Sequence, residues 1–207
     1  MNMRMLSVIA GACYLGIFFL AIYANFFVLE ALIKDPLGTV ANSQQHIRLG
    51  GMAFLLAAVF DVIVAWALLE LYKSNQLSLI STYFRLIHAA LMGAAVFALI
   101  PIIGLTTSDE ILAQVDTFNT IWLIGLFFFG FHLILLARIV KGIRVIPYIL
   151  GLAGTMYILD TTAHFSAANY AEYADIFLMM VALPALLGEM SFTLWLLIKG
   201  GRSAGDG

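Results

Sequence analysis

Seven ionisable side chains lie inside segments that are otherwise apolar enough to cross a lipid bilayer. They are Asp61, Arg85, His88, His132, Asp160, His164 and Glu189. A charge at bilayer depth costs about 2.5–3.5 kcal/mol on insertion scales, so such a residue normally faces a partner, water or a ligand. Residues of these types can orient a ligand, move a proton or hold a metal. They are therefore the candidates for a functional site.

The seven residues separate by depth, which we take from each predicted span at about 1.5 Å per residue. An inner layer is predicted to line one pocket and contains Asp61, Arg85, His88, His132 and Glu189. An outer polar cluster is predicted to contain Asn25, Glu30, Asp160 and His164, with His46 and Arg48 at its rim. The seven ionisable residues thus fall into two groups.

The inner layer has two interpretations. Arg85 neutralised by Asp61 or Glu189 would lose its burial penalty and fix the helix positions. Alternatively, the ion pair borders a cavity and orients a small or lipid-like ligand. One arginine cannot neutralise two carboxylates, so one acid is expected to be protonated or hydrogen-bonded to His88 or His132. Such a coupled group is a candidate for proton transfer.

Asp160 and His164 are four residues apart, which places them on one face of a helix. A local hydrogen bond near the outer interface explains this pair. A divalent metal site completed by His46 or Glu30 explains it as well, because histidine and carboxylate on successive turns can share an ion. Two ligands at this spacing do not decide between the two.

His88 and His132 lie on consecutive predicted spans and could ligate a haem from both sides. Each histidine could equally donate to a neighbouring carbonyl or carboxylate. The chain has one cysteine, Cys13, so neither an intrachain disulfide nor a cysteine-based metal site can form. The sequence has no phosphate-binding glycine loop, no His-Glu-x-x-His motif and no serine elbow.

The composition indicates that these residues are positioned in a membrane. The chain has 207 residues, of which 63% are hydrophobic and 11% charged. Soluble domains are about 45–50% apolar and about 25% charged. A globular core of this size cannot hide the excess, so we expect the lipid bilayer as a partner. The net charge of −2 gives no reason to expect nucleic acid.

Six segments are near or above the ~20 residues that a spanning helix needs. They are residues 5–30, 48–73, 78–104, 119–140, 146–168 and 172–198. Polar or turn-rich stretches separate them, at residues 34–47, 74–76, 106–117, 141–147 and 166–173. The predicted fold is an all-α integral membrane bundle of six transmembrane helices, with residues 1–199 as one domain and 200–207 as a disordered tail. The first segment is long for a signal peptide, so we expect it to be retained.

The basic residues set the expected orientation. One side carries Arg4, Lys73, Arg138, Lys141, Arg144, Lys199 and Arg202, and the other carries Lys34 and Arg48. This asymmetry predicts that both termini are cytoplasmic, in the cell (inner) membrane. An even number of spans agrees with that placement.

Several short stretches carry a resemblance. They are Ala10–Tyr14, Arg48–Gly50, Tyr83–Ile87, Phe128–Leu133, Ile146–Gly151, Tyr157–Asp160, Leu183–Glu189 and Leu194–Gly200. In order and spacing, this pattern resembles the uncharacterised bacterial membrane protein family "domain of unknown function 4386". The resemblance implies a six-helix membrane protein and brings no established activity. It includes Arg85, His132, Asp160 and Glu189 but neither His88 nor His164, on which the haem and metal hypotheses depend.

Three functions follow from these residues. The first is a non-enzymatic pocket for a small or lipid-like ligand around the inner layer. The second is an intramembrane enzyme that uses Glu189 or Asp160 as general acid or base on a lipid or isoprenoid. The third is a proton-linked transporter switched by protonation of Glu189.

Overall fold

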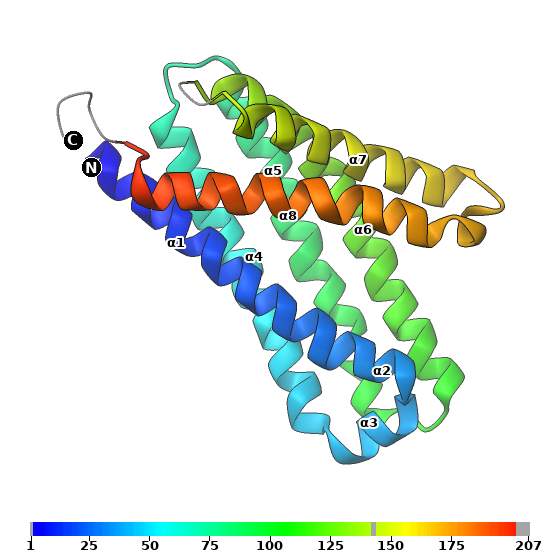
Figure 1. Ribbon diagram of the computed structural model, residues 1–207. Coiled ribbons are helices and arrows are strands. Elements are labelled where there is room, and N and C mark those ends of the chain that lie inside the picture. The colour runs from blue at the N-terminus through cyan, green and yellow to red at the C-terminus, as the bar shows by residue number, and fades with distance from the viewer. Residues whose placement is uncertain (1, 142–143, 202–207) are drawn as a thin grey trace.

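The computed structural model describes residues 2–141 and 144–201, and its regular elements are all helical (Figure 1). The α-helices are α1 (Met3–Ile22), α2 (Glu30–Lys34), α3 (Pro36–Asn42), α4 (Gln44–Leu71), α5 (Leu77–Ala95), α6 (Ser108–Ile139), α7 (Ile146–Ser166) and α8 (Ala174–Ile198). A π-helical segment, η1 (Tyr23–Leu29), joins α1 to α2, and short 3-10 turns are η2 (Val96–Ala98), η3 (Pro101–Gly104) and η4 (Tyr170–Glu172). The predicted all-α class is confirmed. Residues 202–207 of the predicted tail lie outside the described residues.

The six long helices form a closed ring. Each packs against the next in the order α1, α4, α5, α6, α7 and α8, and α8 packs back against α1. Figure 1 shows α1 beginning and α8 ending at the same end of the bundle, which we call the terminal end. There the Arg4 guanidinium donates to the carbonyls of Leu196 at 3.0 Å and Gly200 at 2.9 Å. The ring is therefore closed at the terminal end by the contact between its first and last helices.

Toward the opposite end, which we call the far end, α1 and α8 diverge (Figure 1). Here the chain changes from α-helix to π-helix over Tyr23–Leu29. The wider turn frees backbone carbonyls, and the Asn25 side-chain amide donates to one of them, Ala21, at 2.9 Å. Val28 packs on Gly50 of α4, where a Cβ would come within 2.8 Å of a Val28 methyl group. The π-helical turn thus stays against α4 while α8 departs.

Helices α6 and α7 pack with their backbones in close contact at two glycines. A Cβ on Gly130 would lie 2.6 Å from the Gly154 carbonyl oxygen, and a Cβ on Gly154 would lie 2.5 Å from that of Gly130. Small residues allow this approach, as they commonly do between membrane helices. The hydroxyl of Thr161 also donates to the Leu123 carbonyl at 3.2 Å. These contacts fix α7, and with it the α7–α8 pair, against the rest of the ring.

Two predicted loops are largely helical. Residues 34–47 contain α3 and the first turn of α4, and α6 begins at Ser108 inside the predicted loop 106–117. Thr107 caps α6, because its hydroxyl accepts from the Glu110 amide and donates to the Glu110 carboxylate at 2.7 Å. Thr107 and Glu110 follow the Thr-x-x-Glu pattern of a capping box, with the carboxylate bound to the hydroxyl of Thr107. Polar residues within the stretches predicted to separate the spans thus begin helices.

Within the described residues, five helical segments are long and apolar enough to cross a membrane. They are Met3–Lys34, Gln44–Leu71, Leu77–Gly104, Ser108–Ile139 and Ala174–Ile198. Large apolar side chains such as Phe19, Phe97 and Leu178 are exposed on the outside of the ring, as expected for a surface that faces lipid. Helix α7, which falls in the fifth predicted span, is not among the five.

Candidate functional site

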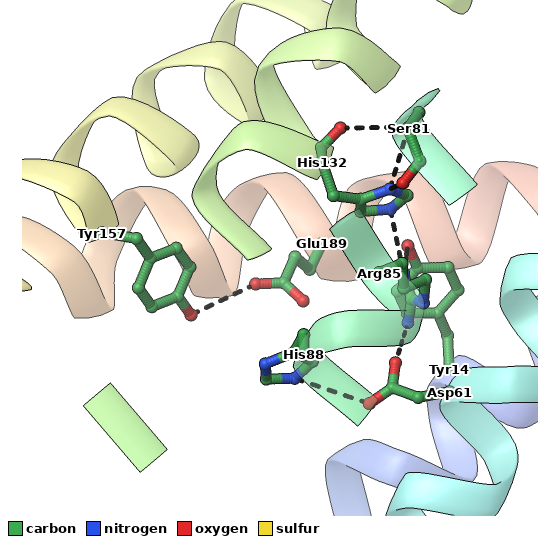
Figure 2. A network of polar contacts seen from close by, with 8 residues as sticks. All are labelled: Tyr14, Asp61, Ser81, Arg85, His88, His132, Tyr157 and Glu189. Carbon is green, nitrogen blue, oxygen red and sulfur yellow. Dashed lines mark hydrogen bonds and ion pairs between the residues drawn. The ribbon is translucent and has the colours of Figure 1, made fainter. Parts of the chain in front are cut away.

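Arg85 is the centre of the buried polar residues (Figure 2). Its side chain is 1% exposed and comes from α5. The guanidinium donates to the Asp61 carboxylate of α4, to the Tyr14 hydroxyl of α1 and, at 3.1 Å, to His132 Nε2 of α6. It also lies over the ring of Tyr14, 4.4 Å from its centroid. One arginine thus ties four of the six long helices together, and a buried charge of this kind is stable only with such partners.

The partners of His132 fix its tautomer. Arginine only donates, so His132 Nε2 must accept the Arg85 hydrogen bond. The proton is therefore on Nδ1, which lies 3.0 Å from the Ser81 carbonyl and 2.9 Å from the Ser81 hydroxyl. His132 is neutral in this arrangement and acts as an acceptor for Arg85.

His88 lies one helical turn beyond Arg85 and faces the same acid. Its Nε2 is 3.6 Å from Asp61 Oδ2. Among the described residues, three buried polar atoms of this group have no hydrogen-bond partner: Asp61 Oδ2, Arg85 Nε and His88 Nδ1. Unpaired buried polar atoms are rare in folded proteins, which sets this group apart from the rest of the core.

Glu189 is placed differently. It lies on α8, and its Oε1 accepts from the Tyr157 hydroxyl of α7 at 3.4 Å. No lysine, arginine or histidine nitrogen of the described residues lies within 4.0 Å of its carboxylate. Figure 2 shows the carboxylate pointing into the space between Tyr157 and the Arg85 group. Of the two acids that the sequence offered to Arg85, the ion pair therefore forms with Asp61.

A cavity of about 410 Å³ separates these two groups. Its polar lining residues are Tyr14, Asn25, Asp61, Arg85, His88, Tyr157, Glu189 and Thr193. Apolar side chains from α1, α4, α5, α6 and α8 complete the wall. Phe26 of the π-helical segment and Leu186 of α8 line it as well, and both are exposed at the surface. The cavity therefore reaches the outside between α1 and α8, where these helices diverge.

The predicted inner layer lies together around this cavity. Asp61, Arg85 and His88 line it from one side and Glu189 from the other, whereas His132 lies behind Arg85 and outside the lining. Sequence reasoning missed the tyrosines of this site. Both Tyr14 and Tyr157 lie well inside their helices, and a phenol at such depth generally needs a polar partner, which was the available signal.

The predicted outer residues do not form one cluster. Asp160 is buried and accepts from the Tyr170 hydroxyl at 2.7 Å, and the His164 ring packs on Tyr170 with centroids 4.7 Å apart. Burial and the neighbouring Asp160 carboxylate raise the pKa of Tyr170 above its ordinary value. Asn25 lies elsewhere, in the cavity wall, and its side-chain amide donates to the Ala21 carbonyl.

The candidate metal and haem ligands are also dispersed. Residues 2–141 and 144–201 contain no group of three or more His, Cys, Asp or Glu side chains arranged to hold a metal. His46 is exposed on the first turn of α4, and Glu30 pairs with Lys34 at 2.6 Å. Both nitrogens of His132 are engaged, and the Phe129 ring packs on His88 and His132, with centroids 4.7 and 5.5 Å apart. A haem between these histidines does not fit that packing.

The model of the family described as "Domain of unknown function (DUF4386)" matches residues 9–200. The chain belongs to this family. An uncharacterized protein of Archaeoglobus fulgidus is 30% identical over 155 residues, which are 72% of this chain and 82% of that relative. No solved structure matches the chain. The DUF4386 match includes every residue of the cavity lining and brings no activity with it.

Proposed function

We propose that the protein is a six-span protein of the cell (inner) membrane with both termini cytoplasmic. Helix α7 is the additional span, because its 21 residues extend about 31 Å and it occupies a full place in the ring between α6 and α8. The orientation follows from the charges. The terminal end carries Arg4, Lys73, Arg138, Lys141, Arg144 and Lys199, whereas Arg202 lies outside the described residues.

We further propose that the cavity binds a lipid-like ligand. The observation that carries this proposal is a cavity of about 410 Å³ whose lining is mostly apolar, includes three charged side chains and reaches exposed apolar residues at the surface. Ligand sites are typically concave and mostly apolar, with a few polar groups that set the orientation. Arg85 and Asp61 are almost fully buried and Glu189 is partly buried, whereas Phe26 and Leu186 are exposed at the mouth. A ligand with a polar head and an apolar tail matches that order.

The route of entry follows from the same geometry. The mouth lies between α1 and α8, on the side of the ring, so a lipid-like molecule reaches it from within the bilayer. Its head then moves toward Glu189 and Tyr157 while its tail stays along Phe26 and Leu186. Such a ligand need not leave the apolar phase in order to bind.

Occupancy of the cavity by lipid tests the proposal. Ala182 lines the cavity from α8 and is exposed at its edge. In Ala182→Trp the indole fills the mouth, so we expect the purified protein to lose a co-purifying amphiphile that mass spectrometry detects in the wild type. Ala90→Trp, at an exposed alanine of α5 outside the lining, is the matched control and should retain it. Equal lipid content in the three proteins, or none in the wild type, would contradict ligand binding.

The enzyme hypothesis receives less support from the geometry. Asp160, one of its two candidate acids, is engaged by Tyr170 and does not line the cavity. Glu189 does line it, but among the described residues its carboxylate is in direct contact only with Tyr157, through a long hydrogen bond of 3.4 Å. Binding is therefore the function we propose.

A further inference from the structure

The charges that line the cavity do not balance. The formally charged lining residues are Asp61, Arg85 and Glu189. Arg85 and Asp61 neutralise each other through a direct hydrogen bond, and both side chains are at most 2% exposed. Glu189 remains. A carboxylate at this depth is costly unless it gains a cation or a proton.

Among the described residues, no group forms a direct ion pair with Glu189. The titratable and charged groups that face the cavity around it are Tyr14 of α1, Asp61 of α4, Arg85 and His88 of α5, and Tyr157 of α7. The guanidinium of Arg85 is already engaged by three partners, and His88 faces Asp61. Within the described residues, the carboxylate of Glu189 has one hydrogen bond, from Tyr157.

The second acid of the lining does not change this imbalance. Asp61 lines the cavity from the opposite side, where it is paired with Arg85 and its Oδ2 atom is buried. Two acids and one arginine therefore line the cavity, and the acid outside the ion pair is Glu189. A cationic ligand complements this arrangement better than an anionic or neutral one.

The aromatic lining favours the same ligand class. Trp122, Phe18, Phe26 and Tyr157 contribute rings to the cavity. Aromatic faces attract organic cations, most strongly when water is excluded. This group already holds one cation in that way, because the Arg85 guanidinium lies over the rings of Tyr14 at 4.4 Å and Phe129 at 5.3 Å.

We propose that the cavity binds a lipophilic organic cation whose charged end pairs with Glu189. This inference rests on the proposed ligand-binding function and narrows it to one class of ligand. Protons compete with the cation for the same carboxylate, so binding weakens as the pH falls. A neutral or anionic lipid lacks the complementary charge and leaves Glu189 unpaired.

A pair of probes with the same shape and opposite charge tests the charge preference. Dodecylammonium is a lipophilic cation that carries its charge at one end of an apolar chain, and dodecylsulfonate is its anionic counterpart with the same chain. We expect saturable binding of the cation to the full-length protein in a neutral detergent, measured by equilibrium dialysis, and no saturable binding of the anion. Glu189→Gln should weaken cation binding about tenfold or more. Glu70→Gln, which removes an exposed acid paired with Lys73, should leave it unchanged.

A second variant and a pH series guard against a folding defect. Glu189→Asp keeps the charge, so it should retain more cation binding than Glu189→Gln while eluting identically in size-exclusion chromatography. Lowering the pH should weaken binding to the wild type and not to Glu189→Gln. Absence of saturable cation binding to the wild type, or equal binding by Glu189→Gln, overturns this inference. If Ala182→Trp still removes a co-purifying lipid in that case, lipid binding stands and only the cation assignment fails.

Discussion

The two sides of the cavity each carry one acidic residue, and the two acids differ in whether a cation of the protein neutralises them. On the side formed by α4, α5 and α6, Asp61 is bound to Arg85 and almost fully buried. On the side formed by α7 and α8, Glu189 is only partly buried and has one long hydrogen bond from Tyr157. Both acids line the same space, but only Asp61 has a cationic side chain within 4.0 Å among the strongly basic residues that the structure describes. The Asp61 carboxylate is neutralised by Arg85 and stabilises the fold; we call this the saturated side. The Glu189 carboxylate has no such partner and is available to a ligand; we call this the open side.

The contrast extends to what holds each side in place. The Arg85 side is fixed by hydrogen bonds among side chains of α1, α4, α5 and α6. The Glu189 side is fixed at a distance, by the Gly130–Gly154 contact and by the Arg4 bonds at the terminal end. Polar contacts inside the cavity therefore stabilise one side, and packing outside the cavity positions the other.

The largest expected effect comes from breaking the saturated side. Arg85→Met leaves the Asp61 carboxylate buried without a counter-charge, and we expect a loss of about 3–5 kcal/mol in unfolding free energy. The double variant Asp61→Leu with Arg85→Met should recover most of this loss, because two apolar side chains replace a buried ion pair at little net cost. Unfolding in mixed micelles with increasing dodecyl sulfate measures both. A single variant as stable as the wild type would show that the pair does not hold the ring.

The stability losses caused by removing the hydroxyls of Tyr14 and Tyr157 test the same contrast between the two sides of the cavity. Tyr14→Phe removes the hydroxyl that accepts from the Arg85 guanidinium, and a hydrogen bond to a charged group is worth about 1.5–3 kcal/mol. Tyr157→Phe removes a bond of 3.4 Å to Glu189, and we expect a loss of about 0.5 kcal/mol. The same unfolding assay compares them. A larger loss for Tyr157→Phe would reverse the assignment of the structural side.

Packing between α6 and α7 is expected to have a similar or smaller effect. Gly154→Ala places a Cβ 2.5 Å from the Gly130 carbonyl oxygen, so the helices must separate, at a cost of about 1–3 kcal/mol. Gly93→Ala is the control, because no atom lies within 4 Å of the added Cβ and alanine favours a helix. We expect the control to match or exceed the wild type in stability. Equal losses from both would mean that helix propensity, not contact, sets the effect.

The sequence predicted the elements of this fold better than their boundaries. Apolar length reveals a spanning helix, so the long helices were found. The cap of α6 at Thr107 and the π-helical turn at Asn25 depend on hydrogen bonds that hydropathy does not record. The choice of Asp61 over Glu189 for Arg85 was also open, because helix depth gives a layer and not the rotation of each helix about its axis. Tyr14 and Tyr157 were missed since an aromatic residue in a span is usually apolar packing.

We expect the smallest effect on stability from a substitution of Glu189, on the open side of the cavity. Glu189→Gln removes a charge that no cation of the described residues neutralises, and glutamine keeps a carbonyl oxygen for Tyr157, so we expect a change within about 1 kcal/mol. Asp61→Asn is the same exchange on the saturated side. It leaves the buried Arg85 guanidinium without its counter-charge, so we expect a loss of about 3–5 kcal/mol in unfolding free energy. Unfolding curves of the two amide variants compare the two acids directly. Equal losses would mean that Glu189 is as much a part of the Arg85 network as Asp61, and the carboxylate would then not be free for a ligand.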